Sequence, residues 1–460
     1  MRKLIASALW ALALALTACR SGGGSSPTLS SGSGTSAPVA SGGSSLSPST
    51  ATLSLAAQVG RQLFFDKTLS GSGKMSCATC HDPGYAYGPP NSLAVQLGGP
   101  DLQSPGTRAV PSLRYKETTP AYSDSAVNPD GVSLPSPGGG FMWDGRADTL
   151  AAQAAVPLLN PVEMDNASPA AVVAAVQAGP TAAPFRQAFG ANVFNDTTTA
   201  FNDIGQALQA YQTEEPSFHP YSSKYDLYAQ NKIGGTLTAA EMRGAIVFSN
   251  AHSGNCAACH YPGAGFNGSS ALFTDFMFEA IGVPRNPEIA ANADSTYFDM
   301  GLCGPDRTDH MPRSPGAPDV YCGLFKTPTL RNVSTRQAFF HNGVMHSLLQ
   351  VVHFYNTRDT NPEIWYPTVG GRPLATPSPN FLTYGLVTTQ YTGGTVQKFN
   401  DLPSAYRGNI DTQVPLDDRP AGSTPPMTDQ QVRDLVCFLG TLTDGYEPSA
   451  SRPTGGPCVN

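Results

Sequence analysis

The sequence predicts a mainly α-helical protein of two domains with long loops. Three observations support this fold class. The chain of 460 residues is long enough for two domains that each have their own core. Its 47 Gly and 41 Pro residues predict long loops. A helical pattern of apolar residues followed by a Cys-x-x-Cys-His motif occurs twice, which indicates a divergent internal repeat.

The Cys-x-x-Cys-His motif occupies residues 77–81 and 256–260. Two thiols at this spacing can add across the two vinyl groups of a haem, and the adjacent His then ligates the iron. A redox-active cysteine pair would not need the His, and a zinc site would need more ligands nearby. We therefore expect two cytochrome c-like domains, each with one covalent c-type haem. The residues expected to hold the haems are Cys77, Cys80 and His81, and Cys256, Cys259 and His260.

The N-terminal residues predict the compartment. Two cations precede an apolar run from Leu4 to Leu16, which is too short to span a bilayer as a mature helix. Residues 1–18 are therefore expected to be a lipoprotein signal peptide, after which Cys19 would be lipidated; an ordinary signal peptide cut elsewhere is the alternative. Arg20 is not the Asp of an inner-membrane retention signal, which favours an outer-membrane anchor facing the periplasm.

The mature chain is expected to begin with a tether and continue as two domains. Residues 19–50 are almost wholly Ser, Gly, Thr, Pro and Ala, which predicts a flexible linker. The N-terminal haem domain is expected over residues 51–232 and the C-terminal one over residues 233–460. No membrane span is expected after the signal, so lipidated Cys19 would be the sole membrane attachment. The formal net charge of −7 argues against binding to nucleic acid and allows docking of a small redox protein.

Periodic apolar residues place the helices along each domain. Long loops are expected at residues 82–140 and 261–325. The second domain begins with a capping box, Thr238 to Glu241. Helices are expected over residues 52–65, 149–155, 169–177, 201–212, 238–248, 347–355 and 428–439.

Four cysteines remain after lipidation and haem attachment. In an oxidising compartment they suggest two disulfides. We expect Cys303 to pair with Cys322 and Cys437 with Cys458, because each pair closes a loop of about 20 residues, and such a closure contributes roughly 3 kcal/mol. The other pairings remain open.

A carboxyl group in an apolar stretch suggests acid–base chemistry. Glu163 follows Trp143 by twenty residues, with Gln153 midway between them. A carboxyl group above a haem can move a proton between the two oxygens of bound peroxide. From the residues alone, a Glu163 that caps a helix or is solvated is the favoured interpretation.

Several stretches follow one another in a distinctive order: residues 60–66, both haem motifs, residues 143–146, Gln153, Glu163, residues 325–332 and residues 340–343. By these stretches, residues 55–445 resemble the bacterial di-haem cytochrome c peroxidase family, which includes MauG. This resemblance implies that Glu163 is the distal acid–base residue of a peroxidatic N-terminal haem, that Gln153 lies beside it, and that Trp143 relays electrons between the haems.

The chain departs from conventional family peroxidases at both distal positions. Those enzymes carry a distal His after the first haem motif, where this chain has Asp101 and no His between His81 and His219. The first haem is therefore expected to be open to peroxide without prior reduction. Fourteen residues after His341, where the conventional family has Met, stands Tyr355. By resemblance to MauG, Tyr355 is the expected second ligand of the haem on His260.

A phenolate ligand has a physical consequence. It donates to oxidised iron more strongly than a thioether and so lowers the reduction potential. Other candidates for this ligand are Met345, His346, His353 and a Met elsewhere in the chain. On an α-helix, His353 points about 160° away from Tyr355, so both cannot face the iron.

Family members also bind Ca²⁺ through an Asn side chain and backbone carbonyls. Ala109 stands where the family has that Asn, so the site is either kept by carbonyls near residues 336–338 or lost.

Three functions remain open. The expected one is reduction of hydrogen peroxide to water with electrons from a small cytochrome c or cupredoxin. The first alternative is MauG-like oxidation of residues on a partner protein. The second is a non-catalytic di-haem electron carrier, which the presence of Glu163 and the absence of a distal His disfavour.

Overall fold

The structure is a computed structural model that describes residues 52–264, 270–312, 319–448 and 458. The expected signal peptide, lipidated Cys19 and tether lie outside the described residues. The chain from Thr52 to Asn460 forms one compact unit. The fold is mainly α-helical with little strand, as predicted. Within the described part, no helix combines the length and apolar character needed to cross a bilayer.

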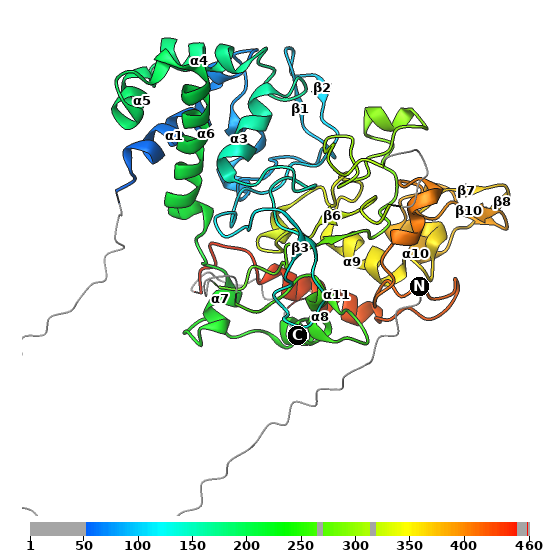
Figure 1. Ribbon diagram of the computed structural model, residues 1–460. Coiled ribbons are helices and arrows are strands. Elements are labelled where there is room, and N and C mark those ends of the chain that lie inside the picture. Colours follow the sequence, from blue (N-terminus) through cyan, green and yellow to red (C-terminus); the bar gives the residue numbers. More distant parts are fainter. Residues whose placement is uncertain (1–51, 265–269, 313–318, 449–457, 459–460) are drawn as a thin grey trace, which may run out of the picture. The chain divides into compact units, whose positions relative to one another are not determined.

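The helices of the first half lie together (Figure 1). Long helix α6 packs against α1 and α3, and a buried core that includes Leu63, Phe64, Phe185 and Leu208 fills the space between them. The α-helices of this half are α1 (Leu55–Phe65), α2 (Cys77–Cys80), α3 (Leu150–Leu159), α4 (Pro169–Ala178), α5 (Ala182–Phe189) and α6 (Thr197–Glu214).

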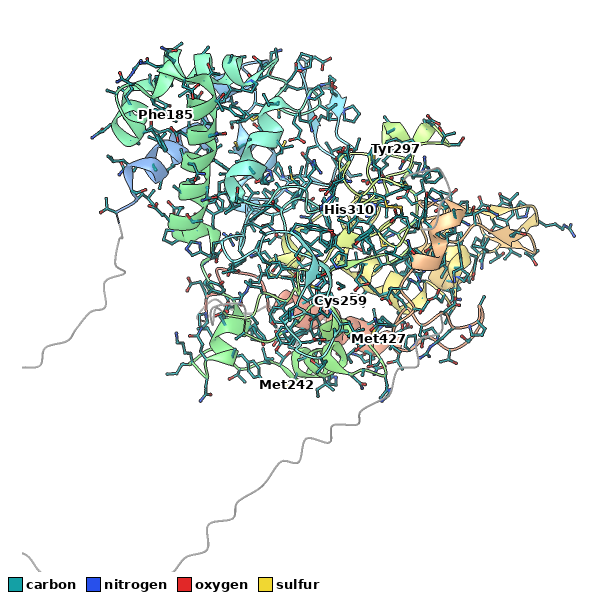
Figure 2. All side chains as sticks on the ribbon, viewed as in Figure 1. Phe185, Met242, Cys259, Tyr297, His310 and Met427 are labelled. Atoms are coloured by element: carbon teal, nitrogen blue, oxygen red, sulfur yellow. A yellow bond between two sulfur atoms is a disulfide. The ribbon has the colours of Figure 1, made fainter. Side chains whose placement is uncertain are left out.

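A second core, which includes Phe248, Phe273 and Phe438, lies between α8 and α11. Figure 2 shows Phe185 among the helices of the first half and Cys259 and Met427 near those of the second. The α-helices of the second half are α7 (Lys224–Ala229), α8 (Ala239–Ser249), α9 (Leu348–Thr357), α10 (Pro379–Tyr384) and α11 (Asp429–Gly440).

The strands form five separate antiparallel pairs of very short strands. They lie in the loops and pin them locally rather than forming a layer of the fold. The pairs are β1 (Leu97–Gly98) with β2 (Ser104–Pro105), β3 (Ser123–Ala126) with β4 (Ser136–Gly138), β5 (Phe278–Glu279) with β6 (Phe325–Lys326), β7 (Thr368–Val369) with β10 (Thr395–Val396), and β8 (Arg372–Pro373) with β9 (Tyr391–Thr392).

The internal repeat is visible in how the helix before each Cys-x-x-Cys-His motif packs, α1 in the first half and α8 in the second. A Cβ on Gly60 of α1 would lie 1.9 Å from the carbonyl oxygen of Ala207 in α6. A Cβ on Gly244 of α8 would lie 2.0 Å from the carbonyl oxygen of Asp434 in α11. Both helices therefore need glycine at the point of closest approach, since any larger residue would separate the pair.

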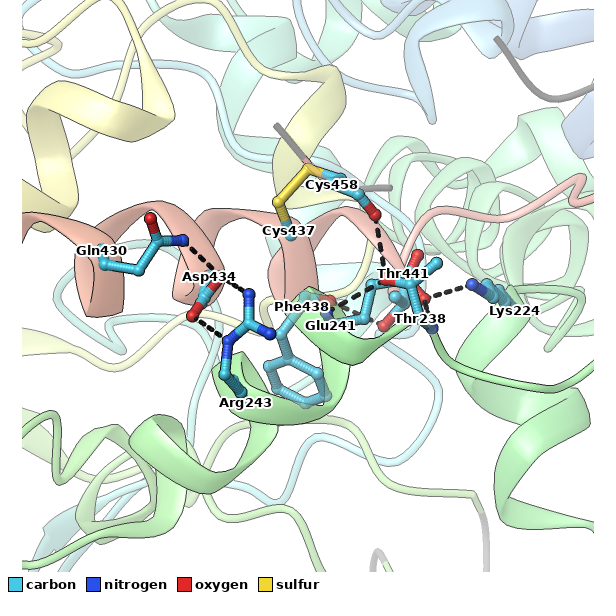
Figure 3. Close-up of a disulfide and its surroundings, with 10 residues drawn as sticks. All are labelled: Lys224, Thr238, Glu241, Arg243, Gln430, Asp434, Cys437, Phe438, Thr441 and Cys458. Atoms are coloured by element: carbon cyan, nitrogen blue, oxygen red, sulfur yellow. Dashed lines mark hydrogen bonds and ion pairs between the residues drawn. A yellow bond between two sulfur atoms is a disulfide. The ribbon is translucent and has the colours of Figure 1, made fainter. Parts of the chain in front are cut away.

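Polar contacts and a disulfide fix α8 against α11 (Figure 3). Arg243 donates to both carboxylate oxygens of Asp434, at 2.7 and 2.9 Å. The Cys437–Cys458 disulfide ties the C-terminal segment to α11, and the Thr238 hydroxyl donates to the Cys458 carbonyl oxygen. This disulfide and the Cys303–Cys322 disulfide are the two expected pairings, which are thus confirmed.

All seven predicted helices form, with bounds within a few residues of those expected. The capping box of α8 at Thr238 and Glu241 is confirmed. Val59 and Leu63 of α1 are buried, whereas Leu55, at the first helical position, is 46% exposed. The prediction missed α5, α7 and α10, which have only six to eight residues each and so give little periodic signal.

Candidate functional site

The first Cys-x-x-Cys-His motif opens onto a cavity of about 340 Å³, called here the first pocket. Cys77 and Cys80 form α2, and the Ser76 amide donates to the Thr79 hydroxyl at the start of this turn. The lining brings together predicted site residues from three segments that are distant in sequence: Cys77, Cys80, His81, Trp143, Gln153 and Glu163.

The second motif opens onto a cavity of about 230 Å³, called here the second pocket. Cys256 and Cys259 lie in and just after a short 3₁₀ helix that follows α8. None of the four motif cysteines is in a disulfide, in contrast to the four other cysteines that the structure describes. The predicted residues that line this pocket are Cys256, Cys259, His260, Trp143 and Tyr355.

The two motif histidines are held in the same way. Nδ1 of His81 lies 3.0 Å from the Tyr87 carbonyl oxygen, and Nδ1 of His260 lies 3.1 Å from that of Phe273. A carbonyl oxygen can only accept, so Nδ1 carries the proton and the lone pair of Nε2 is left for a metal. Burial lowers the pKa of both histidines to about 4, which keeps the imidazoles neutral at ordinary pH.

Glu163 and Gln153 reach the first pocket from α3 and the turn that follows it. Oε1 of Glu163 accepts a hydrogen bond of 2.7 Å from Asn160, and Nε2 of Gln153 lies 3.8 Å from Sδ of Met142. Burial raises the pKa of Glu163, although the Asn160 hydrogen bond and the charge of Arg146 oppose the shift. A carboxyl group with raised proton affinity is better able to accept a proton and then return it.

Trp143 is placed between the two pockets. Together with Pro111 it lines both of them, which no other residue in the described ranges does. Its indole Nε1 donates to the Ala109 carbonyl oxygen at 2.8 Å, and its own carbonyl accepts from the Lys326 amide at 2.9 Å. The first bond holds the ring and the second holds the backbone of Trp143, so the residue is tied to segments from both halves of the chain.

Tyr355 projects from α9 into the second pocket, where it contacts Phe340 and Phe354. Burial, and then the nearby thiols, raise the pKa of its phenol well above the usual value, so ionisation there requires a compensating cation such as a metal ion. Met427 also lines this pocket. The sequence analysis named a Met elsewhere in the chain as another candidate for the second ligand of the haem on His260. Met427 is the methionine that meets this description among the described lining residues.

The other candidate ligands lie elsewhere. The His353 ring stacks on Tyr384, with 3.6 Å between ring centroids. His346 points to Glu288 on the surface, and Met345 is fully buried in the core of the second half. Among the described residues, none of these three lines the second pocket.

Asp101 is exposed, and its carboxylate accepts from the Gln103 amide rather than facing the first pocket. Within the described lining of that pocket, His81 is the single histidine. Methionines Met75, Met142 and Met164 also line it.

Three partly buried cations provide a test of whether a haem fits. Lys116, Lys326 and Arg336 all line the second pocket. Burial lowers their pKa values, to about 8, 7 and 10 respectively. The charge of Arg336 adds to the shift of Lys116, and the charge of Lys116 adds to that of Lys326. Nη2 of Arg336 and Nε2 of His341 are buried without a hydrogen-bond partner. Unmet donors and positive charge match the propionates that a haem would bring, so the residues present fit this group.

Sequence reasoning found the motif residues but missed the groups that orient and balance them. The carbonyls of Tyr87 and Phe273 are backbone groups and carry no side-chain signal. Lys116, Lys326 and Arg336 are common residue types whose burial appears only in the fold. Asp306, which lines the first pocket from the second half of the chain, gave no local signal either.

Three comparisons relate the chain to known proteins. Residues 54–233 match the family model described as di-haem cytochrome c peroxidase. The methylamine utilization protein MauG of Paracoccus denitrificans is 37% identical over 400 residues, covering 85% of this chain and 89% of that protein. Cytochrome c551 peroxidase of Nitrosomonas europaea is 28% identical, covering 67% of this chain and 74% of that protein.

Solved structures agree. The diheme peroxidase BthA from Burkholderia thailandensis matches with a TM-score of 0.70 and 38% identity, over 85% of this chain and 86% of that one. A MauG-like protein associated with microbial copper homeostasis matches with a TM-score of 0.55 and 23% identity, over 86% of this chain and 91% of that one, which supports the fold alone.

Proposed function

The chain belongs to the di-haem cytochrome c peroxidase family, a family of oxidoreductases, and from this premise we propose that it reduces hydrogen peroxide to water with electrons from a small cytochrome c or cupredoxin. The observation that carries the proposal is that Glu163 and His81 line one pocket, which meets a second haem-type pocket at Trp143.

In this proposal the two pockets hold covalent c-type haems in two cytochrome c-like domains, residues 51–232 and 233–460. The two cysteine pairs would hold the haems through thioether bonds, and His81 and His260 would ligate the irons. The free thiols and the protonated Nδ1 atoms support this assignment. When bound, the haem irons supply the redox chemistry that splits the O–O bond and passes electrons between the pockets.

Glu163 moves the proton. Its carboxylate accepts a proton from one oxygen of peroxide and returns it to the other, which then leaves as water. Asn160 holds Oε1 of Glu163, so Oε2 is the atom we assign to this transfer. Gln153 lines the same pocket and brings a polar side-chain amide to it. Each peroxide consumes two electrons from the donor and two protons from solvent and yields two waters.

Trp143 is assigned as the electron relay, because it lines both pockets and is fixed by hydrogen bonds at both ends. We assign Tyr355 as the second ligand of the metal on His260, with Met427 as the alternative that also reaches the pocket.

MauG-like oxidation of a protein partner is the second candidate function. Tyr355 in the second pocket and the lack of a second histidine in the described lining of the first favour it. In that case residues of the partner supply the electrons in place of a small redox protein. A plain electron carrier would have no use for Glu163 beside His81.

Loss of the family calcium site is the outcome we favour. Ala109 is buried and offers no side-chain ligand. The guanidinium of Arg336 already donates to the carbonyl oxygens of Val110 and Ala338, at 3.1 and 3.2 Å, and brings a positive charge to this region. Metal analysis of the purified holoprotein tests this, and one calcium per chain would contradict it.

We also propose that the protein is an outer-membrane lipoprotein facing the periplasm. The apolar run that ends before Cys19 supports this, as do the two disulfides, which suit an oxidising compartment.

Replacement of Glu163 by Gln tests the main proposal. It keeps the shape and the polarity of the side chain but removes the proton acceptor, so we expect kcat for peroxide reduction to fall about 10²–10⁴-fold. The matched control is Glu288→Gln, since this side chain is 57% exposed and lies outside both pockets. Equal activity of the two variants would refute the role of Glu163.

Mixing the fully oxidised protein with peroxide, without a donor, separates the two candidate functions. An immediate change in the haem absorption spectrum that persists after a reduced small redox protein is added favours the MauG-like function. An immediate change that this added donor promptly reverses favours the peroxidase. No reaction before reduction would contradict the expectation of an open first haem.

A further inference from the structure

One wall residue of the first pocket comes from the second half of the chain. Asp306 lines the cavity, whereas its other described lining residues lie between Phe64 and Gln212. Oδ2 of Asp306 lies 3.4 Å from Nη1 of Arg146 and 3.6 Å from Nη1 of Arg108. The Asp306 side chain is 36% exposed and that of Arg146 is 20% exposed, so Asp306 lies on the solvent side of this pair.

The segment that carries Asp306 is held on both sides by residues of the first half. Before it, Asp299 accepts two hydrogen bonds from Arg108, at 2.6 and 2.7 Å. After it, Arg307 donates to the Asp144 carbonyl oxygen at 2.9 Å. These contacts fix the backbone on either side of Asp306, so its carboxylate is positioned rather than loosely placed.

The charges around Glu163 act in opposite directions. Burial raises the pKa of Glu163, Asn160 and the cation of Arg146 lower it, and the anion of Asp306 raises it. Arg146 also pairs with fully buried Asp144 at 2.7 Å, but Asp144 already pairs with a second arginine at the same distance. Asp306 is therefore the anion that completes the neutralisation of Arg146 beside the pocket.

We propose that Asp306 is a positioning residue for the peroxide reaction: its carboxylate holds and neutralises the Arg146 guanidinium, so that Glu163 stays basic enough to accept the proton of peroxide. This inference rests on the proposed role of Glu163. The step is a proton transfer from a peroxide oxygen to the Glu163 carboxylate, with no electron moved. Because Asp306 belongs to the second half, the first pocket is electrostatically complete only when both halves are docked.

The test is Asp306→Asn, with the pH profile of kcat/KM for peroxide as the readout. Removing the Asp306 charge lowers the proton affinity of Glu163, so Glu163 stays ionised to lower pH but becomes a weaker base. We expect the acid limb to move down by about 0.5–1 pH unit and the plateau to fall about 3–10-fold. The matched control is Asp309→Asn, because this side chain is 59% exposed, pairs with Arg307 and lies outside the described pocket lining.

A second variant separates charge from structure. The double variant Asp306→Asn, Arg146→Gln also removes the cation that Asp306 neutralises. The acid limb of its kcat/KM profile should therefore return toward that of the wild type. A lowered rate without a shifted limb, or the same loss in the Asp309 control, would overturn the proposal.

Infrared difference spectroscopy measures the titration of Glu163 without turnover, using the protonated carboxyl band that Glu163→Gln removes. If Glu163→Gln keeps wild-type activity, the proposed function fails on its own. The infrared titration then still decides whether Asp306 acts on Glu163, and an unchanged titration in Asp306→Asn would refute the inference.

Discussion

Replacement of Asp226 by Asn should unfold the protein at a markedly lower temperature. Asp226 and Arg331 form a two-bond ion pair, with N–O distances of 2.7 and 2.9 Å. The side chains are 3% and 0% exposed, and Nε of Arg331 donates to the Ala271 carbonyl oxygen. The substitution keeps the shape of the acid but leaves the guanidinium buried without a counter-charge.

The size of the effect follows from this burial. Breaking a buried ion pair by removing one partner costs about 3–5 kcal/mol. A unit of roughly 400 residues unfolds with an entropy near 0.8 kcal/mol per kelvin, so the expected fall in Tm is about 4–6 °C. The matched control is Asp417→Asn, whose pair with Arg419 is 21% and 31% exposed. Such a pair is worth at most about 1 kcal/mol, or about 1 °C here.

The pH dependence of the Tm difference between Asp226→Asn and the wild type identifies the cause of that difference. Burial opposes ionisation of Asp226, but the hydrogen bonds and the charge of Arg331 outweigh it and hold the pKa of Asp226 below its usual value. Because the pKa of Asp226 is lower in the folded state, the Asp226 carboxylate stabilises the folded protein at pH values above the unfolded-state pKa of about 3.9. This stabilisation is lost as the pH falls through the folded-state pKa. Thermal unfolding of the holoprotein, followed by circular dichroism at one scan rate, should show a gap that narrows below about pH 4. Equal Tm values for the two variants at pH 7 would refute the reasoning.

Three further outcomes test other parts of the molecule. Tyr355→Phe should change the spectrum of the second haem while Met427→Leu leaves it unchanged, and the opposite result would reassign the ligand to Met427. Lys116→Met removes a positive charge from the second pocket and should lower the reduction potential there, as measured by spectroelectrochemical titration; an unchanged potential would mean that the charge is balanced elsewhere. Cys19→Ala should move the protein from the membrane fraction to the soluble periplasmic fraction, and continued membrane association would contradict lipidation of Cys19.

The sequence predicted what is local in the chain. The helices before each haem motif follow from apolar periodicity, and the glycines at their crossings recur at Gly60 and Gly244 because each half solves the same packing problem. The disulfide partners were found because they are close in sequence. The lining residues Glu163 and Tyr355 were found by family resemblance, since neither stands out by its neighbours alone.

What the sequence could not supply depends on contacts between distant segments. The acceptors that fix His81 and His260 are main-chain carbonyls, which any residue could provide. Asp306 is one carboxylate among many in a Gly/Pro-rich loop, and its relevance arises only from its place beside Arg146. Local pattern carries no information on such tertiary contacts.

The two pockets are alike on the side of the motif histidine and differ on the opposite, distal side. In both pockets a partly buried, neutral imidazole is oriented by a carbonyl on Nδ1, so the proximal side does not distinguish the pockets. The first pocket then adds the carboxyl group of Glu163, which can exchange protons, whereas the second adds the phenol of Tyr355 and is also lined by Lys116, Lys326 and Arg336. Glu163 suits a site where a leaving oxygen must be protonated, and Tyr355 suits a site where an oxidised metal must be stabilised. The double variant Glu163→Gln, Tyr355→Phe replaces only these two distal residues. If its two haems stayed spectroscopically distinct and equally reactive, the difference between the pockets would have to lie on the proximal side instead.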